Sequence, residues 1–234
     1  MLEIKNYNSS ILKDISFHLK EDENLIILGQ NGAGKSTLAK VLSNLIENSN
    51  VIINNENLNK IDDKKRAQVI NYIPPKFEIF DEYLTLCEFL ELSFIKEIDY
   101  KKIDEVVSLL KLDKLKHRSC IDFSSGEKQL LLLASSILHD AQITIFDELT
   151  ANLDISRLKE VFDIFSSKYL KQKIIITHNL DLAYALKYKI LYIKDGKIEF
   201  FDESSAFFSS ENLKRFYNNS IIKVNEHLVV NLWK

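Results

Sequence analysis

Cysteine is scarce in this chain, and its few cysteines are poorly placed for metal chemistry. The 234 residues contain 2 cysteines, Cys87 and Cys120, which lie far apart and do not form one of the paired spacings of a zinc site. A disulfide framework needs more cysteines than this. We therefore expect two reduced thiols.

Long apolar runs and an excess of basic residues are also missing. The 31 basic residues against 34 acidic residues give a formal net charge of −3, which excludes a strongly basic nucleic-acid binder. No apolar run approaches the roughly eighteen residues that span a membrane. The start, Met1-Leu2-Glu3-Ile4-Lys5, alternates polar and apolar residues and lacks the layout of a signal peptide. We expect a cytoplasmic chain with no membrane span of its own.

Glycine is scarce too, but three of the 5 glycines fall close together. The segment Gly29-Gln30-Asn31-Gly32-Ala33-Gly34-Lys35-Ser36 fits the phosphate-loop pattern G-x-x-x-x-G-K-[ST] at every fixed position. The apolar run Leu25–Leu28 before it predicts a buried strand, and apolar residues at helical spacing predict a helix from about Ser36. Such a loop binds nucleotide phosphates, with Lys35 at the β- and γ-phosphates and the Ser36 hydroxyl on Mg²⁺.

Two carboxylates stand where another apolar segment ends. Asp147 and Glu148 follow Ile143–Phe146, which places them at the carboxyl edge of a sheet, where ligand sites of open α/β sheets lie. Asp147 is predicted to hold Mg²⁺ through water, and Glu148 to polarise the attacking water. His178 follows the apolar run Ile174–Thr177 in the same way and suits a contact with the γ-phosphate, although a lone histidine there is more often structural.

Strands and helices alternate along most of the chain, which predicts an α/β fold with a mainly parallel sheet. The first residues alternate as antiparallel strands do, and residues 77–115 have mostly helical periodicity. Ile190–Ile193 and Ile198–Phe201 flank Asp195-Gly196, a strong signal for a tight β-hairpin.

A further segment makes this combination of phosphate loop, acidic strand end and histidine resemble an ATP-binding cassette (ABC) ATPase. Phe123-Ser124-Ser125-Gly126-Glu127-Lys128-Gln129 resembles the signature L-S-G-G-Q/E-x-Q of that family and stands between the phosphate loop and the acidic strand. Thr150-Ala151-Asn152-Leu153-Asp154 resembles the D-loop, and His178 fits the switch histidine. Tyr7 suits the aromatic residue that stacks on adenine. The resemblance covers nearly the whole chain.

The resemblance implies a fold, a domain plan and a set of site residues. The fold is a P-loop NTPase core with a mainly parallel sheet, an N-terminal antiparallel β-subdomain and an inserted helical subdomain. Residues 1–234 form a single ABC domain, with the core at about 1–75 and 135–234 and the helical subdomain at about 76–134. Catalysis would rest on Glu148 and His178, and metal binding on Ser36 and Asp147. The nucleotide-binding residues would be Tyr7, Gly29, Gln30, Asn31, Gly32, Ala33, Gly34, Lys35, Ser36, Thr37, Ser124, Ser125, Gly126, Glu127 and Asp154.

The same resemblance implies ATP and Mg²⁺ as cofactors and a second cassette as a partner. Two copies would pack head to tail, with each ATP between the phosphate loop of one and the signature of the other. The segments Asp62–Pro74, Thr150–Asp154 and Asn212–Val230 are similar to the importers of iron chelates and cobalamin. This predicts the ATPase subunit of an importer, bound to separate permease chains on the inner face of the membrane.

Two alternatives stay open. One is a soluble ABC ATPase outside transport, although such proteins usually carry long insertions or two cassettes in one chain. The other is a regulatory cassette with weak hydrolysis, suggested by two departures from the family pattern. Pro75 stands where a glutamine normally helps to hold Mg²⁺ and water, and Ser125 replaces a glycine that would tolerate a positive φ. Intact Glu148 and His178 weigh against this alternative.

Overall fold

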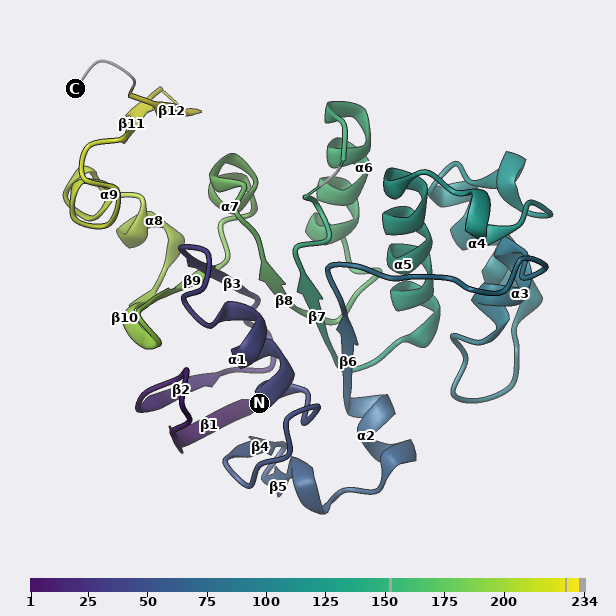
Figure 1. Cartoon of the computed structure of the whole chain (residues 1–234), viewed down its shortest axis with the longest axis horizontal. Helices are drawn as coiled ribbons and strands as arrows, with labels where there is room; N and C mark the ends of the chain where they lie inside the picture. Colours follow the sequence, from purple (N-terminus) through teal and green to yellow (C-terminus); the bar gives the residue numbers. More distant parts are fainter. Residues whose placement is uncertain (152, 226, 232–234) are drawn as a thin grey trace.

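A six-stranded sheet runs through the middle of the computed structural model, which describes residues 1–151, 153–225 and 227–231 (Figure 1). In spatial order its strands are β10 (Lys197–Asp202), β9 (Lys189–Lys194), β3 (Leu25–Gly29), β8 (Gln172–Ile176), β7 (Ile143–Asp147) and β6 (Ile70–Ile73). The strands from β9 to β6 are parallel, and β10 pairs antiparallel with β9. The predicted mainly parallel sheet is confirmed. Side chains that follow β3, β7 and β8 therefore emerge at one edge of the sheet.

A smaller antiparallel sheet is formed mostly by the N-terminal part of the chain. Its order is β2 (Ile15–Leu19), β1 (Leu2–Tyr7), β4 (Val51–Ile53) and β5 (Glu56–Asn57). Alternate residues of β1 and β2 are buried, as the sequence pattern predicted. This confirms the N-terminal antiparallel part of the predicted fold.

The helices follow the strands in the order expected for an α/β protein. They are α1 (Lys35–Leu42), α2 (Asp63–Val69), α3 (Leu86–Glu91), α4 (Tyr100–Leu109), α5 (Ser125–His139), α6 (Ile155–Ser166), α7 (Leu180–Leu186), α8 (Ser204–Phe207) and α9 (Ser210–Tyr217), with short 3₁₀ turns at Leu58–Lys60, Asp113–Leu115 and Cys120–Asp122. Figure 1 shows α3, α4 and α5 grouped beside the outer strand β6, on the side away from the C-terminus. None of the described helices is long and apolar enough to cross a membrane.

The two faces of the main sheet are covered by different elements. Along β3, Ile26 and Leu28 face a core that contains residues of helices α3 to α9. Leu25 and Ile27 point the other way, into a core built from α1 and the antiparallel sheet. A strand buried on both faces has to be apolar throughout, which explains the unbroken run Leu25–Leu28.

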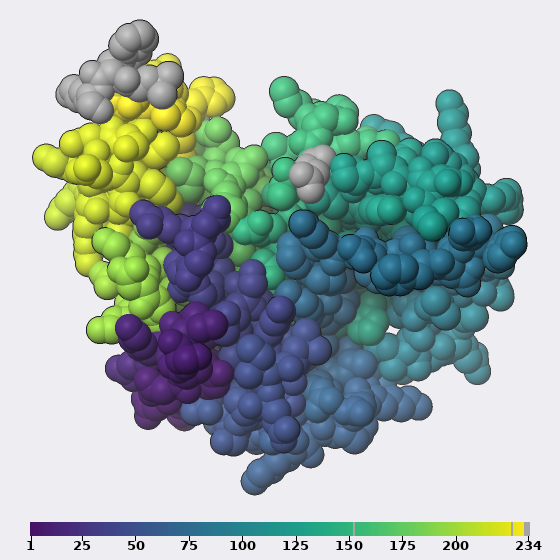
Figure 2. All heavy atoms as spheres, in the orientation of Figure 1, coloured from purple at the N-terminus to yellow at the C-terminus, as the bar shows by residue number. Residues whose placement is uncertain are grey.

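The C-terminal part packs against the β9 side of the sheet. There α8 and α9 place Phe207 and Phe216 against Tyr192 of β9, with ring centroids 5.7 and 4.6 Å away. A final hairpin, β11 (Ile221–Val224) and β12 (His227–Val230), follows α9. In Figure 2 this yellow C-terminal region lies on the same side of the molecule as the purple N-terminal residues, and the teal residues of α4 and α5 lie on the opposite side. The predicted hairpin of β9 and β10 is confirmed, with positive φ angles at Asp195 and Gly196.

Candidate active site

The loop between β3 and α1 has a backbone path that requires glycine at two positions. Gly34 has a φ of 105°, and a Cβ there would lie 2.7 Å from Leu12 Cδ2. A Cβ on Gly29 would lie 2.3 Å from the carbonyl oxygen of Ile193, which shows how closely the loop passes β9. These are the two glycines that the phosphate-loop pattern fixes.

Helix α1 starts directly after this loop with an N-terminus that no side chain caps. Its N-cap is Gly34, and no acidic residue lies in the first turn. Gln30, Asn31 and Gly32 are exposed in the loop. Ala33 is buried in the core below, and Ser36 and Thr37 are half-buried in the first turn. The positive end of the helix and its backbone N–H groups therefore provide a site for an anion.

Lys35 is folded back onto the loop that precedes it. Its Nζ donates to the carbonyl oxygens of Gly29 and Gln30, each at 3.0 Å, and only 5% of the residue is exposed. Burial lowers the pKa of Lys35, while the nearby carboxylates of Glu148 and Asp147 act in the opposite direction. The ammonium group is thus held among acceptors at the centre of the loop, where a phosphate group would compete for it.

Asp147 lies at the end of β7 with both carboxylate oxygens engaged. Ser36 Oγ donates to Oδ1 at 3.1 Å, and the Tyr72 hydroxyl donates to Oδ2 at 2.9 Å. Asp147 is fully buried, and burial raises the pKa of its carboxyl, opposed by the hydrogen bonds from Ser36 and Tyr72. Burial also raises the pKa of Tyr72, which keeps its phenol protonated as a donor. The hydroxyl of Ser36 and the carboxylate of Asp147 are hard oxygen donors, which fit Mg²⁺.

Glu148 and His178 face each other beyond the carboxyl ends of the paired strands β7 and β8. His178 Nε2 lies 2.7 Å from Glu148 Oε1, and their side chains are 43% and 29% exposed, so water reaches both. Glu148 adopts a φ of 54°, which is uncommon for glutamate, and its N–H donates to the carbonyl of Ile176 at 3.0 Å. This backbone turn directs the carboxylate toward the histidine. The sequence had singled out these two residues separately, and the structure joins them.

Two hollows meet at His178. One has a volume of about 340 Å³ and is bordered by Glu148, Thr150 and Thr177 among others. The second, of about 210 Å³, reaches from His178 to Gly29 and Gln30. The hollowed surface thus continues from the phosphate loop to the Glu148–His178 pair, as a nucleotide and its attacking water would require.

The signature-like segment lies elsewhere, at the start of α5. Ser124 is the N-cap of this helix and forms a capping box, in which its Oγ accepts from the Glu127 N–H and its own N–H donates to Glu127 Oε2. Ser124 and Ser125 are exposed, and Gly126 is half-buried. Among the described residues, no hydrogen bond or ion pair joins Ser124–Glu127 to the phosphate loop.

Ser125 does not cause the backbone strain that its position had suggested. It is the first residue of a right-handed helix and is not among the residues with a positive φ. A serine is compatible with this conformation, so a positive φ does not make the substitution costly here.

Asp154 of the D-loop segment serves its own chain as a helix cap. It is the N-cap of α6, and its Oδ1 accepts from the Arg157 N–H at 2.9 Å and from Ser156 Oγ at 2.7 Å. The Arg157 N–H is the main reason that the pKa of Asp154 is lowered. The residue is exposed and makes no contact with the phosphate loop within the described chain. Asn152 of the same segment lies outside the described residues.

Tyr7 lies at the end of β1 and is largely buried. The residue is 7% exposed and belongs to the core that the antiparallel sheet shares with α1, which also contains Ala33 of the phosphate loop. Stacking of its ring on adenine stays a prediction.

One site residue was not anticipated. Tyr72 reaches Asp147 from the neighbouring strand β6, and no local pattern in the sequence marks it. Only the pairing of β6 with β7 brings Tyr72 and Asp147 together, so their contact can be recognised only from the tertiary structure.

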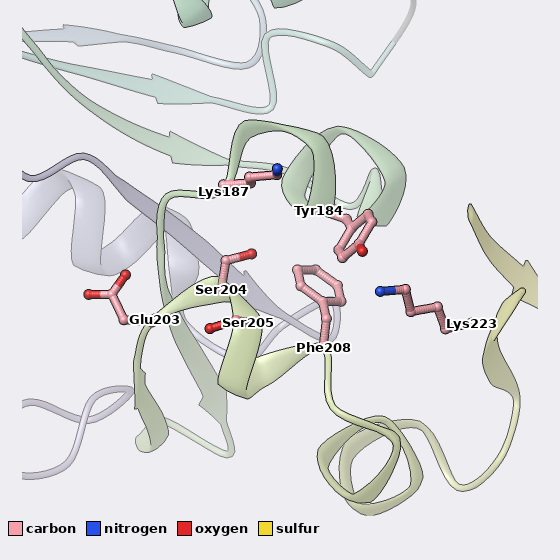
Figure 3. A pocket seen from close by; sticks show the side chains of 7 residues that line it. All are labelled: Tyr184, Lys187, Glu203, Ser204, Ser205, Phe208 and Lys223. Atoms are coloured by element: carbon pink, nitrogen blue, oxygen red, sulfur yellow. The ribbon is translucent and has the colours of Figure 1, made fainter. Parts of the chain in front are cut away.

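Another hollow lies away from these residues, between α7, α8 and β11 (Figure 3). It measures about 400 Å³, and its lining includes Lys187, Ser204, Phe208 and Lys223. None of the residues predicted for nucleotide binding lines it.

Comparison with known proteins gives consistent results. The family described as ABC transporter matches residues 12–151. A putative ABC transporter ATP-binding protein of Clostridium tetani is 31% identical over 194 residues, which cover 80% of this chain and 44% of that protein. The phosphonates import ATP-binding protein of Fusobacterium nucleatum is 26% identical over 93% of this chain and 96% of its own length. The chain thus spans less than half of some relatives and nearly all of others.

Solved structures share the fold. An ATP-binding cassette, captured as a dimer after hydrolysis with ADP and Pi, aligns with a TM-score of 0.76 at 23% identity, over 87% of this chain and 99% of the other. A putative metal-chelate type ABC transporter in an inward-facing conformation gives 0.76 at 21% identity, over 97% and 94%. Because the family match covers more than half of its length, this chain belongs to the ABC transporter family.

Proposed function

We propose that the chain is the ATP-hydrolysing subunit of an importer and that it works with separate membrane permease chains. The observation that carries the proposal is the arrangement of Lys35, Ser36, Asp147 and the Glu148–His178 pair around one edge of the sheet. This arrangement combines a phosphate-binding loop, two oxygen donors for Mg²⁺ and a carboxylate able to activate water.

In this proposal, ATP binding exchanges the internal contacts of Lys35 for contacts with phosphate. The Nζ leaves the carbonyls of Gly29 and Gln30 and pairs with the β- and γ-phosphates, which the loop N–H groups also bind. Ser36 and Asp147 would hold Mg²⁺, which neutralises charge on the phosphate oxygens.

Glu148 and His178 are the proposed catalytic residues. Glu148 accepts a hydrogen bond from the attacking water, and its orientation is set by the backbone turn after β7 and by the 2.7 Å contact with His178. His178, at the end of β8, is the candidate for the contact with the γ-phosphate.

The signature and D-loop residues act, in this proposal, on the nucleotide of a second copy. Ser124, Ser125, Gly126 and Glu127 are at the N-terminus of the 15-residue helix α5, where backbone N–H groups favour a phosphate. Among the described residues they form no hydrogen bond with this chain's own phosphate loop, which supports a role across an interface. The exposure of Ser124 and Asp154 supports the same role. Residues 76–134 would form the subdomain that carries this surface, and the resulting dimer would close on ATP.

The transport function is inferred from relatives. The import ATPase of Fusobacterium nucleatum matches almost end to end, and the metal-chelate transporter shares the fold. We propose uptake of an iron-chelate or cobalamin-like compound, with the chain bound to its permease at the inner face of the membrane.

A regulatory cassette with weak hydrolysis is the second candidate, since Pro75 supplies no side chain for metal or water.

Steady-state ATP hydrolysis by the purified chain, with Glu148→Gln as the control, tests the enzyme part. Turnover that disappears in the variant is the expected result. Binding of ATP with no turnover, alone and after co-purification with a permease, would favour the regulatory candidate. Co-purification with an integral membrane protein tests the transport part, and its consistent failure would favour a soluble ATPase.

A further inference from the structure

Tyr72 makes a side-chain hydrogen bond that crosses from β6 to the acidic end of β7. The two strands are parallel, with Tyr72 opposite Ile145 and Ile73 opposite Phe146. From this register the half-buried Tyr72 side chain extends to the last residue of β7, and its hydroxyl donates to Asp147 Oδ2 at 2.9 Å.

The Asp147 carboxylate depends on hydroxyl groups for its orientation. The residue is fully buried, and no lysine or arginine among the described residues forms an ion pair with it. Ser36 fixes Oδ1 from α1, and Tyr72 fixes Oδ2 from β6. The terminal torsion of an aspartate is broad and rotates easily, so two donors on opposite oxygens are what holds it.

This orientation matters for the proposed metal site. Ser36 Oγ can offer a lone pair to Mg²⁺ while its O–H donates to Asp147 Oδ1, provided that Oδ1 keeps facing Ser36. Rotation of the carboxylate would break that arrangement. The Tyr72 bond to the other oxygen opposes that rotation.

The segment after β6 offers no substitute. Ile73, Pro74 and Pro75 follow Tyr72, and none has a side chain that donates or accepts a hydrogen bond. Pro75 is the position at which the sequence departs from the family pattern. Tyr72 is therefore the polar side chain through which this strand acts on the site.

We propose that Tyr72 is a positioning residue that holds Asp147 in the rotation needed for Mg²⁺ binding. This inference rests on the proposed function, because it concerns the same metal site. It differs from a structural role, in which the bond would only satisfy a buried phenol and its loss would lower stability without changing metal affinity.

The experiment measures Mg²⁺ binding and not turnover. In the Glu148→Gln background, binding of a fluorescent ATP analogue is titrated with free Mg²⁺, with and without Tyr72→Phe. We expect the Mg²⁺ midpoint to rise about tenfold on loss of this charge-assisted hydrogen bond, with unchanged binding of the analogue in EDTA.

Tyr188→Phe is the matched control. Tyr188 is also a half-buried tyrosine whose hydroxyl donates to a single partner, the carbonyl of Phe165, away from the metal site. Its loss should lower the thermal midpoint as much as Tyr72→Phe does and leave the Mg²⁺ midpoint unchanged. Tyr72→His also removes the phenol hydroxyl, and its shorter side chain does not extend to Asp147, so it should raise the Mg²⁺ midpoint as Tyr72→Phe does and serves as the second variant if Tyr72→Phe does not fold.

An unchanged Mg²⁺ midpoint in folded Tyr72→Phe would overturn the inference and leave the proposed function intact. So would equal midpoint shifts in Tyr72→Phe and Tyr188→Phe, or an unchanged Mg²⁺ midpoint in folded Tyr72→His. If binding of the analogue to the chain with Tyr72 did not depend on the Mg²⁺ concentration, the proposed metal site itself would be refuted.

Discussion

Replacing Lys35 by methionine should change nucleotide affinity and stability in different directions. The substitution keeps the length of the side chain but removes the ammonium group, which now donates to the Gly29 and Gln30 carbonyls at 3.0 Å. On ATP binding these two bonds to neutral acceptors are exchanged for bonds to anionic phosphate. Each new contact adds the attraction between opposite charges to the hydrogen bond, which at a solvent-accessible site contributes about 1 to 1.5 kcal/mol.

Two such exchanges contribute about 2 to 3 kcal/mol, and their loss should weaken ATP binding by about 30- to 150-fold. Isothermal titration calorimetry with Mg-ATP measures this ratio directly. Lys40→Met is the matched control, because Lys40 lies on the same helix with its side chain exposed. If Lys35→Met bound ATP within threefold of the unmodified chain, Lys35 would not be a phosphate ligand.

The effect of Lys35 on stability follows from its burial. Burial holds the pKa of Lys35 below its usual value, so the unfolded chain binds more protons than the folded chain between those two pKa values. The free energy of unfolding contributed by this group therefore rises with pH through that window, below about 10.5. Lys35→Met should lack this rise and should be at least as stable as the unmodified chain at pH 7, as urea unfolding at several pH values would show. A less stable variant at pH 7 would mean that the two carbonyl contacts outweigh the burial of the charge.

The remaining predictions concern hydrolysis, the altered loop and the glycines. Glu148→Gln should trap an ATP-bound dimer, and a monomer by light scattering with Mg-ATP would contradict the head-to-tail arrangement. Pro75→Gln should raise ATP turnover, or its coupling to a permease, because it returns a polar side chain to the loop after β6; unchanged rates would mean that the site already holds metal and water in another way. Gly34→Ala should lower the free energy of unfolding by about 1 to 3 kcal/mol, more than Gly32→Ala, because both have a positive φ but only Gly34 would also press a Cβ against Leu12. If urea titration showed equal losses of unfolding free energy for the two variants, the positive φ alone would explain the destabilisation.

The parts of the site that sit at strand ends could be predicted from sequence. Asp147 and Glu148 follow an apolar run that is buried on both faces, and His178 follows another. Because parallel strands share a carboxyl edge, the fold class alone brings these residues together. Their placement needed only local periodicity and the topology that it implies.

Tyr72 and Tyr7 show what local patterns do not determine. Tyr72 reaches Asp147 only through the pairing of β6 with β7, and its own neighbours give no sign of that partner. Tyr7 has the predicted spacing from the loop, but its degree of burial is decided by how the antiparallel sheet packs on α1. Both features depend on contacts between elements distant in sequence.

The proposed catalytic and binding groups are paired with one another. Lys35 is bonded to its own loop, Ser36 to Asp147, and Glu148 to His178. A nucleotide must therefore replace existing contacts, so part of the gross interaction energy is spent on breaking them and the net affinity falls. The same exchange gives two arrangements of these side chains, one for each nucleotide state. A ligand can shift a conformational equilibrium only as far as its contacts differ between the two states. An ATPase that turns binding and release into movement of a partner needs that difference, and paired side chains that must separate when ATP binds are a physical source of it.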